Sequence, residues 1–550
     1  MIPDADTMAF RRPPDQVMHL ARLGSAHPTR LSFLRVLLRR MQAAHWTFDR
    51  PVWEIDAKGT GRAVYRANGP DRSYSLVAFA HDLPDDMRSD RVIATAWDAT
   101  FALFDGTPTA ADLDRLAANV PLQEAGRIAP SELVLSRANR SVRLFAHVVE
   151  RLATGQQPER AEIEAVGYLM RTTAVYGSGK FGAADRAAIA DRLELRAPFQ
   201  AEMLSVWLTR RFSVDLAEHM AVAQGGASAV PLDKALRRRL GVGNSTGLGL
   251  APFLIRHPIL LNNWIMAREE AFARVRAQPQ AEAQALAGFQ AALEDAMANA
   301  QSWVSDHPVQ LAKLVDLRAD LARIAAAGVP AGAHPWDRLW HWAEASLSFE
   351  GQEALVSIML EPHGGLVDDL ADGMDAEEAK AFALDGAQTV ASFRTGLIRR
   401  YGWALETDYD APPNVARFWY VSAEKLEPRM GERCQDAGVE LELPIGIGRI
   451  TAALDRTLAD WPQDQPLAHF LLAHPEHRFM ARRVQQSARF PYMEIRDNLL
   501  AADMLPIDIL RCKLACFGAS HFDPRSDRWV RISLFQGLPF PDDLLAEVTS

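Results

Sequence analysis

The run YSLVAFAH, residues 74–81, decides how the first part of the chain folds. It is a β-branched and aromatic segment bounded by turn-forming residues, which is typical of a strand. A similar run, RVIATAW, covers residues 91–97, and ANGPD at 67–71 has the composition of a hairpin connection. The sequence therefore predicts a small antiparallel sheet over residues 52–104.

Outward from this sheet the pattern is mostly helical. LSFLRVLLRRMQAAHW (31–46) precedes the sheet, and PERAEIEAVGYLMRTT (158–173) starts with a proline and early carboxylates, which helix N-termini favour. Apolar residues then recur every three or four positions on one helix face at Leu286, Phe289, Leu293, Met297, Ala300 and Val304. A last strand-like run, WVRISLF, covers residues 529–535.

The expected fold is mainly α with a smaller α+β part, and 550 residues are too many for one hydrophobic core. AAAGVPAGAHP (325–335) replaces the helical pattern and suggests a boundary. We expect three units: an α+β unit with the antiparallel sheet at 1–130, a helical domain with two glycine-rich loops at 131–330, and a helical domain at 331–550. The tetrapeptide RSDR precedes strand-like runs in the first and third units, so the C-terminal strand can return to the N-terminal sheet.

Composition limits the classes of partner. The net charge is −10, and no extended basic stripe interleaved with aromatic residues is present, so we expect no nucleic-acid partner. No apolar run reaches the roughly 18 residues of a membrane helix, so we expect no membrane partner either. The few cysteines, Cys434, Cys512 and Cys516, fit a reducing compartment, and we expect a cytoplasmic, multidomain protein.

Two glycine-rich stretches are the best candidates for chemistry. YGSGKFG (176–182) resembles a nucleotide loop but fails the Walker A pattern, and GVGNSTGLGLAPFLIRHP (241–258) fails the Rossmann pattern. Free backbone amides and short polar side chains near helix N-termini suit an anion. The expected substrate-binding residues are Gly177, Ser178, Gly179, Lys180, Gly243, Asn244, Ser245, Thr246, Gly247, Arg256 and Asn263.

Both glycine-rich stretches also have a purely structural interpretation. The glycines also fit helix caps and helix connections, with Lys180 pointing into water.

His257 is the expected proton-transfer residue because the ordinary pKa of histidine lies near neutrality. His81 and Asp98 end strand-like runs, where turn-forming residues are also common. We expect no metal site, since no histidine or cysteine spacing matches a standard ligand set, and Cys512 and Cys516 look like small core residues on a helix.

Two functions from different classes remain open at this point. One is a soluble intracellular enzyme that binds an anionic small molecule, phosphate-containing or carboxylate, in a pocket of the helical region. The other is a non-catalytic helical interaction or regulatory protein whose glycine-rich loops are only helix caps. A nucleic-acid binder using ALRRRLG (235–241) and Arg137, Arg140 and Arg143 is a minor third interpretation. The sequence leaves the reaction, the cofactor and the oligomeric state open.

Overall fold

The structure is a computed structural model, and the residues that it describes make up most of the chain. They are 5–87, 96–122, 126–172, 186–189, 191–247, 257–303, 308–374, 382–409, 417–420, 428–429, 440–441, 443–496, 507–524 and 529–546.

The described strands form one large sheet and one small sheet. The large sheet has the strand order β1-β2-β3-β4-β5-β6-β7-β12-β11. Its strands are β1 (Thr47–Ile55), β2 (Gly61–Asn68), β3 (Ser73–Ala80), β4 (Ala99–Asp105), β5 (Glu132–Arg140), β6 (Tyr168–Thr172), β7 (Gly241–Gly247), β11 (Ala519–Pro524) and β12 (Trp529–Leu534). The small sheet has the order β10-β8-β9, with β8 (Arg417–Tyr420), β9 (Pro428–Arg429) and β10 (Glu440–Leu441).

The described helices make up the larger part of the fold, as expected for a mainly α protein with a β part. They are α1 (Pro14–Val17), α2 (Leu20–Leu23), α3 (Phe33–Ala43), α4 (Ala110–Asn119), α5 (Phe145–Ala153), α6 (Arg160–Val166), α7 (Arg186–Ile189), α8 (Gln200–Gly225), α9 (Lys234–Arg238), α11 (Pro258–Arg276), α12 (Ala283–Ser302), α13 (Pro308–Ala327), α14 (Pro335–Ser346), α15 (Phe349–Leu360), α16 (Gly364–Val367), α17 (Val390–Leu405), α18 (Leu443–Ala459), α19 (Leu467–Ala473), α20 (Arg478–Arg489), α21 (Ile507–Phe517) and α22 (Pro541–Ala546). No described helix is both long enough and apolar enough to cross a membrane.

The sheet is mixed, which corrects the prediction of an antiparallel sheet. The N-terminal strands β1 to β6 pair antiparallel, and the predicted hairpin connection is confirmed because Asn68 of β2 pairs with Ser73 of β3. The next pair, β6 and β7, is parallel. β12 then pairs antiparallel with β7, so strands from both ends of the chain share one sheet.

The helical domain that the sequence predicts at residues 131–330 also contains the strands β5, β6 and β7. α6 ends at Gly167, which adopts a left-handed φ of 77°, and the chain then turns into β6. Glycine takes this conformation without the steric cost that other residues have. All five residues of β6 are buried, so the central position of this strand in the sheet overrides the helical character of the sequence around it.

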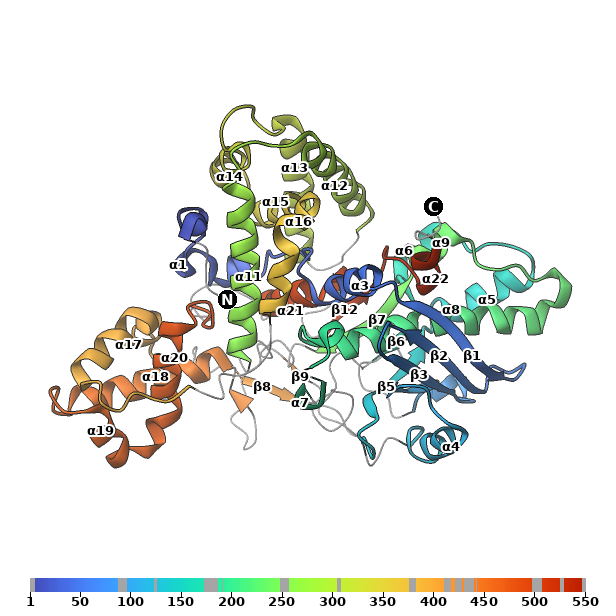
Figure 1. Ribbon diagram of the computed structural model, residues 1–550, viewed down its shortest axis with the longest axis horizontal. Coiled ribbons are helices and arrows are strands. Elements are labelled where there is room, and N and C mark those ends of the chain that lie inside the picture. The colour runs from blue at the N-terminus through green and yellow to red at the C-terminus, as the bar shows by residue number, and fades with distance from the viewer. Residues whose placement is uncertain are drawn as a thin grey trace.

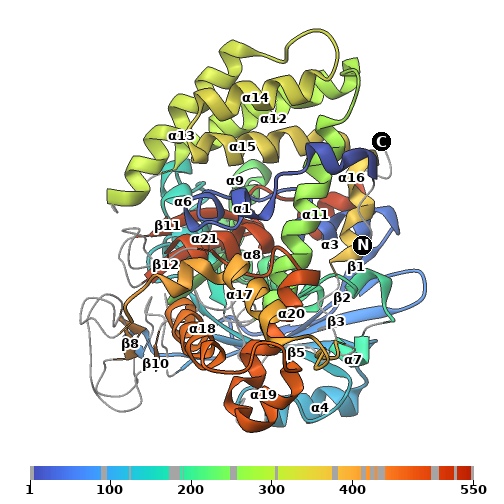
Figure 2. The ribbon, with the colours of Figure 1, turned by 90° about the vertical axis from the view of Figure 1, so that its left-hand side faces the viewer.

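Helices cover both faces of the N-terminal strands (Figure 1). Successive strand residues point to opposite faces. Tyr65 and Phe101 contact the ring of Phe212 in α8, whereas Val64 and Val77 share a separate core with α4. Away from the sheet, α12 to α15 gather in one lobe and α17 to α20 in another (Figures 1 and 2).

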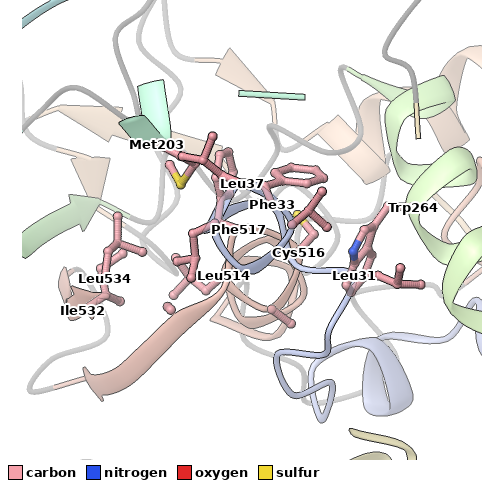
Figure 3. Close-up of a cluster of buried hydrophobic side chains, with 14 of the residues drawn as sticks. Leu31, Phe33, Leu37, Met203, Trp264, Leu514, Cys516, Phe517, Ile532 and Leu534 are labelled. Carbon is pink, nitrogen blue, oxygen red and sulfur yellow. The ribbon is translucent and has the colours of Figure 1, made fainter. Parts of the chain in front are cut away.

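A buried core joins the sheet to these lobes. α21 packs against α3, where the rings of Phe33 and Phe517 meet edge to face with centroids 5.3 Å apart. Ile532 of β12 and Trp264 of α11 lie around the same helix pair (Figure 3). Cys516 also lies in this core and Cys512 is buried on the same helix, which confirms their interpretation as core residues. The core therefore depends on segments from distant parts of the sequence.

Buried ion pairs connect the N-terminal segment to α11 and α15. Arg12 donates to both carboxylate oxygens of Glu269 at 2.6 and 2.7 Å, and to Glu353 at 2.7 Å. Arg22 and Arg268 also pair with Glu353. Three guanidinium groups therefore surround the fully buried Glu353 carboxylate.

Candidate functional site

The second glycine-rich stretch begins as a strand and is not a connection between helices. Residues 242–247 of β7 pair with β12, so the amides on that edge belong to the sheet. A Cβ on Gly241 would lie 2.2 Å from the carbonyl oxygen of Leu534, and a Cβ on Gly243 would lie 2.5 Å from the ring of Tyr168. Close packing within the sheet therefore accounts for both glycines, and the expected anion hole of free amides is wrong for the β12 edge of this strand.

Asn244 is the predicted residue in β7 whose side chain is available for a ligand. The residue is 2% exposed, and its amide nitrogen has no hydrogen-bond partner in the described structure. Buried polar atoms normally have a hydrogen-bond partner, so a buried donor without one is a candidate contact for a ligand or a water molecule. Ser245, Thr246 and Gly247 continue the strand beside Asn244 and pair with residues 529–531.

The first glycine-rich stretch follows directly on β6. Gly177, Ser178, Gly179 and Lys180 lie outside the described residues, as does Arg256, and their expected roles stay predictions. β6 ends at Thr172, a few residues before them. Because β6 and β7 are parallel neighbours, both strands run toward the same end of the sheet.

The other two predicted residues lie at the start of α11. His257 immediately precedes the helix, its side chain is exposed, and Pro258 is the first helical residue. Asn263, one turn into the helix, accepts a hydrogen bond of 3.2 Å from the side chain of Asn262. Asn262 in turn accepts from the backbone N–H of Tyr492 at 3.0 Å, so this pair of amides also fixes the helix to the segment before residue 497.

A row of polar residues crosses the sheet at the level of Arg171, one residue before β6 ends. Arg171 pairs with Gly243 on one side and with Asn139 of β5 on the other. Asn139 accepts a hydrogen bond of 2.9 Å from the backbone N–H of Asp98, which directly precedes β4. The backbone carbonyl of Asp98 accepts from the N–H of His81 at 2.8 Å. Residues in or directly beside four neighbouring strands, β3 to β6, thus bring polar groups to one line, which we call the polar row.

Asp98 is the fixed anion of the polar row. It is fully buried, and its carboxylate accepts a hydrogen bond of 2.9 Å from the backbone N–H of Arg140. The Arg140 guanidinium lies 3.7 Å from the same carboxylate and 4.9 Å from the centre of the Phe145 ring. A buried carboxylate needs such partners to stay charged, so Asp98 and Arg140 form one unit.

Further cationic and titratable groups lie beside this unit. The Arg137 guanidinium stacks over the ring of Trp97 at 4.2 Å, and burial lowers the pKa of Arg137. Burial also lowers the pKa of His81, against the opposite pull of the Asp98 carboxylate. His81 is therefore mostly the neutral imidazole at pH 7, a form able to accept a proton. Arg140 is the arginine among these that contacts the Asp98 carboxylate.

Sequence reasoning found only part of this arrangement. His81 and Asp98 were noted as strand-end residues, and Arg137 and Arg140 only as part of a basic set. Arg171 and Asn139 were missed because a single arginine or asparagine within an apolar run carries no local signal. Only the pairing of β5 with β6 shows that they are neighbours.

Metal-ligating and aromatic side chains are a further kind of candidate site. No group of three or more histidine, cysteine or acidic side chains among the described residues is arranged to hold a metal ion. Trp336 and Trp340 of α14 are fully buried, and their rings contact Phe289 of α12 and Phe272 of α11.

Comparisons with known protein families, with curated proteins and with solved structures find no match to this chain.

Proposed function

We propose that this protein is an enzyme that binds an anionic small molecule, phosphate-containing or carboxylate, where the chain leaves β6 and β7. The observation that carries the proposal is the parallel pairing of these two strands. In sheets with parallel strands, ligands bind beyond the carboxyl ends of the strands. Both glycine-rich stretches continue from these two ends, so the parallel pair favours one shared site over two separate turns.

The charge distribution supports an anion over a cation. Arg137, Arg140 and Arg171 lie at or beside the polar row, and Asp98 is the described carboxylate among them. Lys180 and Arg256 would add positive charge to this group of arginines if they approach it. The free amide nitrogen of Asn244 supplies a neutral donor next to Gly243.

The proposed chemistry needs one group that exchanges protons near neutral pH. His257 remains our candidate for this role, on its ordinary pKa and its exposed place at the start of α11. His81 is a second candidate because it belongs to the polar row and its lowered pKa favours the neutral base. Separate His257→Gln and His81→Gln variants would distinguish the two, since only the reacting histidine would shape a pH–rate profile.

The binding proposal is tested first by thermal shift on the purified protein with nucleotides, coenzyme A thioesters, phosphorylated metabolites and small carboxylates. A ligand at a hundred times its dissociation constant adds about 2.7 kcal/mol of stability. We expect one anion class to stabilise the protein, and Lys180→Ala and Arg137→Gln to remove the effect. Arg66→Gln is the matched control, because Arg66 is an arginine of the same sheet that pairs with Asp49 at its outer edge.

The opposite results would contradict the proposal. If no anion class stabilises the protein, or if the stabilisation survives both variants, the glycine-rich stretches are structural. The chain would then be better described as a helical interaction or regulatory protein.

A further inference from the structure

A cavity of about 470 Å³ lies between the lobe of α12, α13 and α15 and the ends of α21 and β12. This volume is within the range of small-molecule pockets, which are mostly apolar with a few placed polar groups. Its apolar walls come from three helices, through Ala292, Ala296, Leu317, Leu321, Ala354 and Ile358. The cavity lies past the carboxyl end of β12, beside the start of β7, whereas the proposed anion site lies beyond the opposite end of β7.

Two aromatic rings give the cavity a flat side. The rings of His27 and Trp303 are nearly parallel, with planes 8° apart and centroids 6.4 Å apart. His27 is held from behind, because its Nε2 atom lies 3.2 Å from a carboxylate oxygen of Glu350. Glu350 is itself paired with the buried Arg511. A planar, apolar ligand body fits against such a surface.

The charges that line the cavity are not balanced. The guanidinium of Arg35 is paired with both carboxylate oxygens of Glu361, so this pair neutralises itself. Asp295 lines the rim from α12, and no hydrogen bond or ion pair engages it in the described structure. Asn299, one helical turn later, also lines the cavity. Asp295 and Trp303 both line the cavity, and a carboxylate without a partner at the rim of an apolar cavity attracts an organic cation.

We infer that this cavity binds an organic amine with a flat apolar body. The body lies against His27 and Trp303 between the helices, and the ammonium group pairs with Asp295 at the rim. Its occupant has the charge opposite to the ligand of the proposed function, so the two sites are independent and are tested with different compounds.

Isothermal titration calorimetry with three indoles of one shape tests the inference. Tryptamine carries an amine, tryptophol a hydroxyl group and indole-3-propionate a carboxylate on the same ring. We expect tryptamine to bind about threefold to fivefold more tightly than tryptophol, the effect of one ion pair at the rim. Indole-3-propionate should bind most weakly.

Two variants separate charge from shape. Asp295→Asn should make tryptamine and tryptophol bind equally, whereas Ala292→Trp should fill the cavity and abolish binding of all three compounds. Glu294→Gln is the matched control, because Glu294 is an exposed acid on the same helix and does not line the cavity. Circular dichroism would verify that Ala292→Trp remains folded, and Asp295→Asn changes only an exposed side chain.

The inference is overturned if none of the three compounds gives a binding signal, or if indole-3-propionate binds as tightly as tryptamine. It is also overturned if Asp295→Asn leaves the preference for tryptamine unchanged.

Discussion

Replacing Glu353 by glutamine should destabilise this protein strongly. Glu353 lies on α15 with no exposed surface, and the guanidinium groups of Arg12, Arg22 and Arg268 all pair with its carboxylate. The substitution keeps the shape and removes one negative charge. It leaves Arg12 and Arg268 with Glu269 as their remaining buried acidic partner and removes the ion pair of Arg22. Removing one partner from a buried ion pair costs about 3–5 kcal/mol, because the charge left behind is no longer compensated.

Urea unfolding followed by tryptophan fluorescence measures this cost. The Arg12 guanidinium lies 5.1 Å from the ring centre of Trp340, so the probe reports on the affected region. Glu54→Gln is the matched control, because Glu54 pairs with Arg62 in an exposed strand pair, and such pairs contribute about 0.2–1 kcal/mol. If both variants lose the same small free energy of unfolding, the buried network does not stabilise the fold as argued.

The pH dependence of the same variant gives a second check. Burial raises the pKa of Glu353, but the arginines, led by Arg12, lower it more, and the result lies well below the ordinary value of 4.5. A lowered folded-state pKa means that the contribution is complete above about pH 5 and is lost as the pH falls. The difference in stability between wild type and Glu353→Gln should therefore shrink from pH 7 to pH 4. A difference that stays constant over this range would contradict the ionised state of Glu353.

Three further predictions follow from buried positions. Gly243→Ala should destabilise the protein by about 1–3 kcal/mol in urea unfolding because the new Cβ meets a tyrosine ring, whereas Gly402→Ala, with open space around it, should not. In a Cys434→Ser background, Cys512 should resist thiol reagents at pH 8 until the protein is unfolded, since burial raises its pKa to about 12; labelling of the native protein would contradict this. Arg210→Met should cost about 3 kcal/mol or more in urea, because the buried Arg210 side chain donates to four backbone carbonyl groups, of which that of Leu240 is buried; a neutral result would show that these groups find other partners.

Local patterns sufficed for elements whose stability is mainly local. The helix expected from LSFLRVLLRRMQAAHW is present as α3, with Phe33, Leu37 and Met41 buried. The hairpin of β2 and β3 was also predictable, because its turn and both strands are adjacent in the sequence. In each case neighbouring residues contain the signal, so the interpretation did not depend on distant partners.

The central strands were not predictable in this way. Most positions of GVGNSTG are glycine or short polar residues, which strands generally disfavour. The stretch is a strand because β12, from the far end of the chain, pairs with it. β6 was mistaken for the end of a helix because α6 precedes it and only Gly167 separates them. When two strands pair over such long sequence distances, neither segment needs the alternating hydrophobic pattern from which a strand can be predicted.

The glycines of the second stretch show why the candidate site was only partly visible. Counted along the sequence, they exceed what a helix connection needs, and this excess suggested a ligand. In the fold, Gly241 and Gly243 are required by a carbonyl oxygen and an aromatic ring of neighbouring strands. The support for a ligand site is therefore the parallel direction of β6 and β7, and not the number of glycines. If β7 were antiparallel to β6, the two strands would end at opposite sides of the sheet. The glycine-rich segments could then not share a ligand. The parallel register of Arg171 with Gly243 is thus the point on which the proposed site depends.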